Sequence, residues 1–215
     1  RLLDPPLHEF LPQTDEQINE LANELNIKVD NIKQNIDDLH ETNPMLGHRG
    51  CRLGITYPEI TKMQAEAIFS ASKQLVDEGI QPQPEIMIPL IGTANEFINQ
   101  SDVILSVYSK MNFQMDCRIG TMIELPRACL IADKIAKHAD FFSFGTNDLT
   151  QTTFGYSRDD AGGFIYDYIK ESLLPGDPFE SIDTEGVGVL VKMAVKKGRK
   201  INPDLKIGIC GEHGG

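Results

Sequence analysis

Two carboxylic acids each follow an apolar segment of the sequence and could together hold a metal ion. Glu124 ends the run that starts at Ile119, and Asp148 ends the string Phe144-Gly-Thr-Asn-Asp. Two carboxylates, completed by water and ligand oxygens, suit Mg²⁺, which prefers hard oxygen donors and seldom has an all-protein cage. Taken singly, Glu124 could instead pair with Arg127, and Gly-Thr-Asn-Asp could be an ordinary turn. Together the two acids favour a divalent-metal site.

Several nearby or loop residues could bind an anion beside such a metal. Gly145, Thr146 and Asn147 offer backbone N–H groups and an amide, which can hold phosphate or carboxylate oxygens without adding charge. Three arginines neighbour glycine, proline or polar loop residues, and a planar guanidinium grips carboxylate or phosphate at two points. They are Arg1, Arg49 and Arg158. For each of them a surface role is the alternative.

The chemistry of Cys210 and His48 stays open from the residues alone. Cys210 ends an apolar run and precedes Gly-Glu-His-Gly, whose glycines leave room for a ligand. It is either an inert buried thiol or a proton donor, since a thiol is mostly protonated at neutral pH. His48 either orients Arg49, contacts the ligand, or makes a structural hydrogen bond. The cysteines show no Cys-x-x-Cys spacing, which argues against zinc and favours a reducing compartment.

The bulk composition excludes some classes of partner. The chain has 215 residues, 40% of them hydrophobic, and a net charge of −12. Such an acidic chain does not favour binding of nucleic acid or anionic lipid. Any anionic ligand must therefore be bound by positive charges gathered locally at its site. No apolar run reaches the length of about eighteen residues that a membrane span needs. The chain starts without Met and ends at Gly215, and we expect both ends to lie inside a larger protein.

Short apolar runs alternate with amphipathic stretches, which indicates parallel strands joined by helices. The expected strands lie at residues 85–90, 118–123, 141–144 and 205–210, and the expected helices at 59–78, 94–110, 127–138 and 186–199. Residues 14–40 interrupt this rhythm after an opening segment that we expect to be a further strand. There we expect a helical hairpin with a capping box at Thr14, a second cap at Asp30, and apolar faces formed by Ile18, Leu21 and Leu25 and by Ile32, Ile36 and Leu39.

The same alternation fits a closed barrel or an open doubly wound sheet. Polar residues stand where several runs end, and in a (β/α)8 barrel these ends meet at one rim, whereas an open sheet spreads them along a line. No Gly-x-Gly-x-x-Gly follows any strand, which disfavours a dinucleotide fold. The prediction is therefore an α/β fold, an incomplete TIM-type barrel with about six of its eight strands in one domain, residues 1–215.

Six strings of the sequence resemble the phosphoenolpyruvate- and pyruvate-binding domain of the pyruvate, phosphate dikinase family. They are residues Arg1–Phe10, Asn43–Arg52, Ile119–Glu124, Phe141–Gln151, Ser157–Ala161 and Gly208–Gly215. Together they extend over essentially the whole chain. The related phosphoenolpyruvate synthase and enzyme I of the sugar phosphotransferase system share the Asn-Asp-Leu-Thr-Gln and Cys-Gly-Glu strings. Gly-His-Arg-Gly-Cys-Arg and Ser-Arg-Asp-Asp-Ala favour the dikinases.

This resemblance implies a specific reaction. The family makes phosphoenolpyruvate, AMP and pyrophosphate from pyruvate, ATP and phosphate through a phosphohistidine, and a barrel of this kind performs the pyruvate half. By position in the motifs, Glu124 and Asp148 would hold Mg²⁺ at the substrate, and Cys210 would be the proton donor to the methylene carbon. Substrate oxygens would be bound by Arg1, Arg49, Arg158 and Asn147, with backbone of Gly145 and Thr146.

The resemblance also implies what these residues do not supply. The family's nucleotide-binding and phosphohistidine domains, a further substrate arginine and the last barrel strand have no counterpart here, so we expect no complete reaction from this chain alone. The expected partners are pyruvate or phosphoenolpyruvate, the phosphohistidine domain and a second copy in a homodimer. The alternatives are a phosphoenolpyruvate synthase or enzyme I-type barrel, a non-catalytic phosphoenolpyruvate sensor, or an inactive truncation product. The compartment is either cytoplasm or an organelle.

Overall fold

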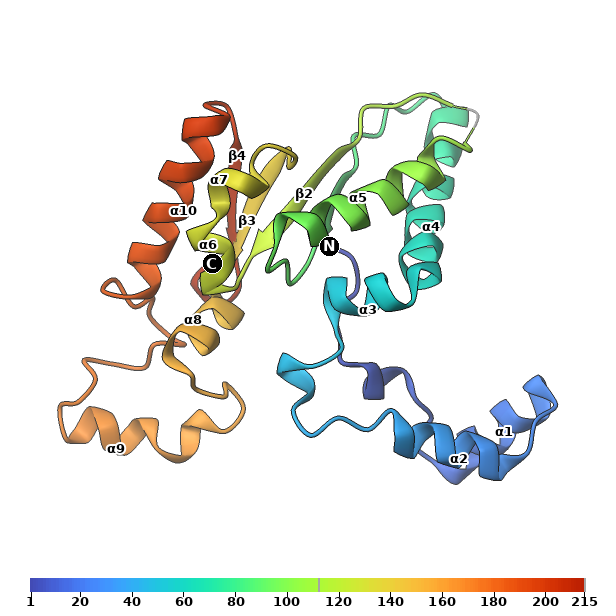
Figure 1. Cartoon of the computed structure of the whole chain (residues 1–215), viewed down its shortest axis with the longest axis horizontal. Helices are drawn as coiled ribbons and strands as arrows, with labels where there is room; N and C mark the ends of the chain where they lie inside the picture. Colours follow the sequence, from blue (N-terminus) through green and yellow to red (C-terminus); the bar gives the residue numbers. More distant parts are fainter. Residues whose placement is uncertain (112, 215) are drawn as a thin grey trace.

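The sheet at the centre of the protein has four parallel strands. The computed structural model describes residues 1–111 and 113–214. Within them the strands are β1 (Glu85–Ile88), β2 (Arg118–Ile123), β3 (Phe141–Gly145) and β4 (Lys206–Cys210), arranged in the order β1-β2-β3-β4 (Figure 1). Each pair is parallel, so the four carboxyl ends lie at the same end of the sheet. The predicted α/β class and all four predicted strand segments are confirmed.

The sheet is open, and the expected strand count of about six is wrong for the described residues, which contain four. The opening segment was expected to be a further strand. It lies along β1 and donates one hydrogen bond, from the Leu2 backbone N to the Met87 O, at 3.0 Å. Pro5 and Pro6 follow, and proline has no N–H to extend such a ladder. The segment therefore lies against the sheet, with Leu2 and Asp4 buried, without being a strand.

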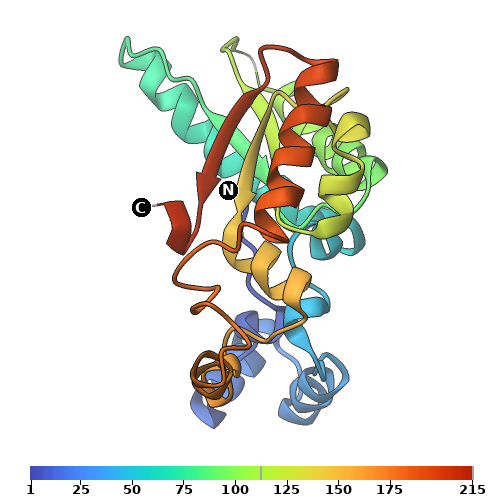
Figure 2. The ribbon, with the colours of Figure 1, turned by 90° about the vertical axis from the view of Figure 1, so that its left-hand side faces the viewer.

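Helices pack against the sheet and enclose the main apolar core. They are α4 (Pro58–Asp77), α5 (Ala94–Tyr108), α6 (Pro126–Leu130), α7 (Ala132–Ile135) and α10 (Val187–Ile201). Figure 2 shows α10 and α7 together on one face of the sheet. Phe142 and Phe144 of β3 are fully buried among them, beside Ile123 and Ala194. The single helix expected at 127–138 is two short ones, because the backbone at Ile131 leaves helical geometry.

Two smaller parts project beyond the carboxyl ends of the strands (Figure 1). One follows α8 (Thr146–Phe154) and contains α9 (Ile165–Lys170). The other is the predicted hairpin, α1 (Asp15–Leu25) and α2 (Val29–Asp38), which leads through a loop to α3 (Gly50–Thr56). No helix in the described ranges is long and apolar enough to cross a membrane.

The structure of the hairpin confirms part of what was predicted for residues 14–40. Thr14 and Gln17 form the expected capping box, and Ile18, Ala22 and Ile32 make a small core of their own. Two expectations were wrong. The second helix is capped at Lys28 without a side-chain bond, so Asp30 lies inside its first turn. Leu25 is exposed, because the hairpin's narrow core ends one turn earlier.

A substitution at Gly120 in β2 tests how closely β2 packs against β3. A Cβ added at Gly120 would lie 2.5 Å from the Phe141 backbone O, and a backbone atom cannot move away as a flexible side chain can. We expect Gly120→Ala to lower the free energy of unfolding by about 1–3 kcal/mol. The measurement is urea unfolding of both proteins.

Gly162→Ala is the matched control, because a Cβ there meets nothing within 4 Å. It should change the free energy of unfolding by less than about 0.5 kcal/mol. Equal unfolding midpoints for Gly120→Ala and the parent would contradict the close packing of β2 on β3.

Candidate metal and substrate site

The predicted site residues of β2, β3 and β4 come together at the carboxyl end of the sheet. Glu124 directly follows β2, and Asp148 lies in the first turn of α8, which starts as soon as β3 ends. Gly145 at the end of β3 is paired in register with Cys210 at the end of β4. Parallel pairing therefore brings two acids and a thiol, separated by up to 86 residues, to the same end of the sheet.

Glu124 is almost completely buried, with 1% of its surface exposed. Its Oε1 accepts a hydrogen bond from the Leu90 backbone N at 2.5 Å, and its Oε2 has no partner within the described part of the chain. Leu90 adopts a left-handed backbone (φ 62°), which is costly for a branched residue and marks a strained position beside the acid. Arg127 donates to the Gly92 carbonyl, so the alternative Glu124–Arg127 pair does not form.

A third carboxylate, missed from the sequence, completes the cluster. Ligand oxygens of Asp4, Glu124 and Asp148 all lie within 4.8 Å of one another. Asp4 follows Leu2-Leu3, a weaker form of the signal that identified Glu124, namely an acid after an apolar segment. The residues fit a divalent cation, because three hard oxygen donors converge and the unpartnered Glu124 Oε2 belongs to the group.

Arg49 bridges two of these acids. Its Nε and Nη2 donate to Asp4 at 3.2 and 2.7 Å, and its Nη1 and Nη2 donate to Asp148 at 3.4 and 3.2 Å. Burial lowers the pKa of Arg49, but the hydrogen bonds and charges of the two aspartates outweigh burial and raise it above its ordinary value. Three ionised carboxylates and one guanidinium leave a charge of −2, which a divalent cation would balance.

The environment of Glu124 opposes ionisation when no cation is present. Burial raises the pKa of Glu124 to about 8, and the negative charges of Asp148 and Asp4 act in the same direction. The Leu90 N–H and the Arg49 charge act against this rise without cancelling it. A divalent cation beside the carboxylate favours its charged form, so proton and metal compete for Glu124.

The Cys210 thiol is half-buried at the end of β4. It lies 3.4 Å from the Phe144 carbonyl O and 3.7 Å from the Ser143 hydroxyl. Two other cysteines differ from it. Cys51 and Cys129 are buried in the core, and burial raises the pKa of both thiols. A thiol at the site edge can reach a ligand, whereas these two cannot.

The start of α8 is packed closely against the end of β4. The Thr146 hydroxyl donates to the Cys210 carbonyl at 3.0 Å, and Asn147 Oδ1 accepts from the Glu212 backbone N at 3.2 Å. A Cβ at Gly145 would lie 2.8 Å from Glu124 Oε2, so glycine lets β3 approach the buried acid. These contacts place Gly145, Thr146 and Asn147 between the carboxylate cluster and the thiol.

The other two predicted arginines, Arg1 and Arg158, are about half exposed. Arg1 is 48% exposed, and its Nη1 is 3.9 Å from Asp4 Oδ2. Arg158 is 46% exposed and pairs with Glu212 at 2.8 Å, two residues beyond Cys210. His48 hydrogen-bonds the Thr56 hydroxyl, which is the structural alternative left open by the sequence.

The raised pKa of Glu124 predicts how pH and Mg²⁺ affect stability. An unfolded Glu has a pKa of about 4.3, so the metal-free folded chain binds this proton more tightly than the unfolded chain. Metal-free stability should therefore fall as pH rises from about 4 towards 8. Glu124→Gln should flatten that fall and be more stable than the parent at pH 8 in EDTA. Mg²⁺ should stabilise the parent and leave the variant nearly unchanged.

Thermal unfolding across pH, with EDTA or Mg²⁺, measures these effects. Glu66→Gln, at an exposed position of α4, is the control and should behave as the parent. Equal stabilisation of the Glu124→Gln variant and the parent by Mg²⁺ would contradict the metal site.

Comparison with known proteins identifies the family of this chain. The family model described as "PEP-utilising enzyme, PEP-binding domain" matches residues 1–215. The chain is 58% identical to pyruvate, phosphate dikinase 1, chloroplastic, of Arabidopsis thaliana and 55% identical to pyruvate, phosphate dikinase of Clostridium symbiosum. All of the chain is aligned in both cases, to 23% and 25% of those proteins, so it spans about a quarter of their length. The chain belongs to the PEP-utilising enzymes, and its residues match their PEP-binding domain.

Proposed function

We propose that this chain binds phosphoenolpyruvate and pyruvate and performs the pyruvate half of a pyruvate, phosphate dikinase reaction. In that half-reaction a phosphoryl group passes between a phosphohistidine and pyruvate, with Mg²⁺ bound. The observation that carries the proposal is the meeting of a buried, partly unpartnered carboxylate cluster and a half-buried thiol at one edge of the sheet. The dikinase names of the relatives support it.

The carboxylate cluster is suited to hold the cation. Glu124 and Asp148 would be its ligands, with Asp4 beside them. Bound there, Mg²⁺ would act as a Lewis acid for the oxygen on which the enolate charge develops. The fixed carboxylates contribute by orienting the substrate oxygens before reaction. Orientation matters because phosphoryl transfer through a loose transition state depends mainly on in-line positioning and charge stabilisation.

In this proposal Cys210 would move the proton. When phosphoenolpyruvate is made, a C–H bond of the pyruvate methyl group breaks, the proton goes to the Cys210 thiolate, and the enolate oxygen attacks phosphorus as the P–N bond of phosphohistidine breaks. In the opposite direction the thiol returns its proton to the methylene carbon. The hydrogen bond between Thr146 and the Cys210 backbone fixes the thiol relative to α8.

Substrate oxygens would be bound from the two sides of the cluster. Arg1 and Arg158 are each about half exposed, so their guanidinium groups retain N–H donors for a phosphoryl or carboxylate group. The Asn147 amide and the backbone of Gly145 and Thr146 lie at the end of β3 and the start of α8. Negative charge that develops on the substrate oxygens would thus be stabilised by fixed hydrogen-bond donors in a partly buried site.

The larger assembly is part of the same proposal. We infer that the four-stranded sheet is a section of a (β/α)8 barrel, because all polar strand ends meet at one edge as a barrel rim requires. A phosphohistidine domain would deliver the phosphoryl group, and the protein would act as a homodimer. The relative from Arabidopsis thaliana is named chloroplastic.

Cys210→Ala tests the chemistry. In the full-length protein this change should slow exchange of pyruvate methyl protons with solvent by about a hundredfold or more, since a positioned acid–base group contributes that much. The Mg²⁺–oxalate dissociation constant should change less than about threefold, because the thiol reacts but does not hold the ligand. Deuterium incorporation followed by NMR measures the exchange.

Cys117→Ala is the matched control, since that half-exposed cysteine lies at the opposite, amino end of β2. It should exchange protons as the parent does. Parent-like exchange in Cys210→Ala would refute the acid–base role of Cys210.

A further inference from the structure

The backbone of Leu90 directs a hydrogen-bond donor at the buried carboxylate of Glu124. Its N–H donates to Glu124 Oε1 at 2.5 Å, and its φ of 62° is left-handed. This conformation is costly for a bulky residue, so other contacts must hold it in place. The N–H occupies one oxygen of the carboxylate. The other oxygen, Oε2, has no donor within the described residues and stays available for a cation.

Cys51 of α3 holds this strained turn by two hydrogen bonds. Its backbone N donates to the Pro89 O at 3.3 Å, and its thiol donates to the Leu90 O at 3.2 Å. Burial raises the pKa of the Cys51 thiol, so the thiol keeps the proton that the hydrogen bond needs. Leu90 is therefore fastened to Glu124 through its N–H and to Cys51 through its carbonyl.

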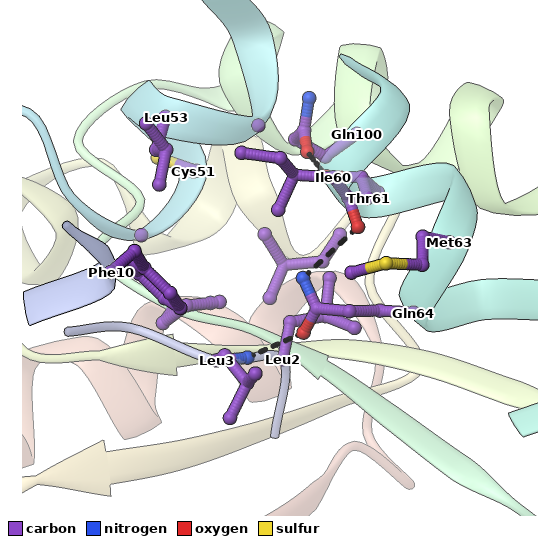
Figure 3. Close-up of a pocket in the computed structure, with 14 residues that line it drawn as sticks. Leu2, Leu3, Phe10, Cys51, Leu53, Ile60, Thr61, Met63, Gln64 and Gln100 are labelled. Atoms are coloured by element: carbon purple, nitrogen blue, oxygen red, sulfur yellow. Dashed lines mark hydrogen bonds between the residues drawn. The ribbon is translucent and has the colours of Figure 1, made fainter. Parts of the chain in front are cut away.

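The start of α3 is packed directly against Leu90. A Cβ added at Gly50 would lie 2.9 Å from the Leu90 Cβ, which is closer than two such atoms can approach. The Leu90 side chain is itself 2% exposed. Cys51 and Leu53 also line a pocket of about 40 Å³ between the opening segment, α3 and α4 (Figure 3). The contact with Leu90 is thus tight, whereas some free space adjoins the Cys51 side chain.

We propose that Cys51 and the Leu90 backbone are positioning groups for the metal ligand Glu124: the Cys51 thiol holds the left-handed turn, and the turn aims its N–H at Oε1, so that Oε2 faces the cation. This inference rests on the proposed metal-dependent function. Without the thiol donor the Leu90 peptide unit can relax towards an unstrained conformation, and its N–H no longer fixes the carboxylate in one orientation.

Substitutions at Cys51 separate the hydrogen bond from packing. Cys51→Ser keeps a donor, whereas Cys51→Ala and Cys51→Val remove it, and the adjoining pocket leaves room for the additional methyl group of valine. In the full-length protein, the Mg²⁺ dissociation constant should rise by about threefold to tenfold in both donor-free variants and by less than about twofold in Cys51→Ser. The pyruvate KM at saturating Mg²⁺ should change by less than about threefold in all three variants.

The same three substitutions at Cys129 are the matched controls, because Cys129 is equally buried in the core but lies on α6. They should leave the Mg²⁺ constant unchanged. Thermal midpoints measured in EDTA report the packing loss of each variant, and all constants are measured well below these midpoints.

The Leu90 N–H can also be removed alone. Incorporating the α-hydroxy acid analogue of leucine at position 90 replaces this amide by an ester and keeps the side chain. The Mg²⁺ constant should then rise by about tenfold to a hundredfold, as for other groups that orient metal ligands.

Three results would overturn the positioning role. They are parent-like Mg²⁺ constants in the donor-free Cys51 variants, an equal rise in Cys51→Ser and Cys51→Ala, or a parent-like constant in the folded ester variant. A parent protein without any Mg²⁺ response would instead refute the proposed function itself. The two failures are therefore distinguishable.

Discussion

The structure depends on keeping three carboxylates close together, two of them buried and the third, that of Asp148, partly exposed. Like charges within 4.8 Å repel when buried, so the arrangement requires either positive charge at the same point or a proton on Glu124. Arg49 supplies one unit and is itself held by two of the acids. The remaining unpartnered oxygen on Glu124 defines the place where a cation completes the balance. The position of each segment that carries one of these acids is therefore constrained.

The scaffold meets this constraint by parallel pairing. Parallel strands present their carboxyl ends at one edge, and here β2 ends in one acid while β3 turns at Gly145 directly into the helix that carries another. Apolar side chains such as Phe142 and Phe144 fix the strands from the helical side of the sheet. The polar end can then be strained, as at Leu90, because the core below it is well packed.

The sequence predicted the parts whose signals are local. Apolar runs located all four strands, and an acid at the end of a run located Glu124 and Asp148. Asp4 was missed because only two apolar residues precede it, and the tertiary contact with Arg49 leaves no trace in spacing. The break at Ile131 and the cap at Lys28 were missed for a related reason, since packing and not local propensity decided them. Part of the error in the strand count arose because one hydrogen bond does not make the opening segment a strand.

The same contacts bear on whether the acidic cluster is structural or functional. A structural cluster would satisfy every buried oxygen with donors of its own chain, as most buried polar groups are satisfied. Asp4 meets that condition through Arg49, whereas Glu124 keeps one oxygen without a donor in the described residues and lies beside two other acids. A buried carboxylate oxygen without a donor lowers stability. In the described residues no interaction offsets that loss, whereas a bound cation would. The electrostatics of the cluster therefore favour a metal-binding role for Glu124 over a purely structural one.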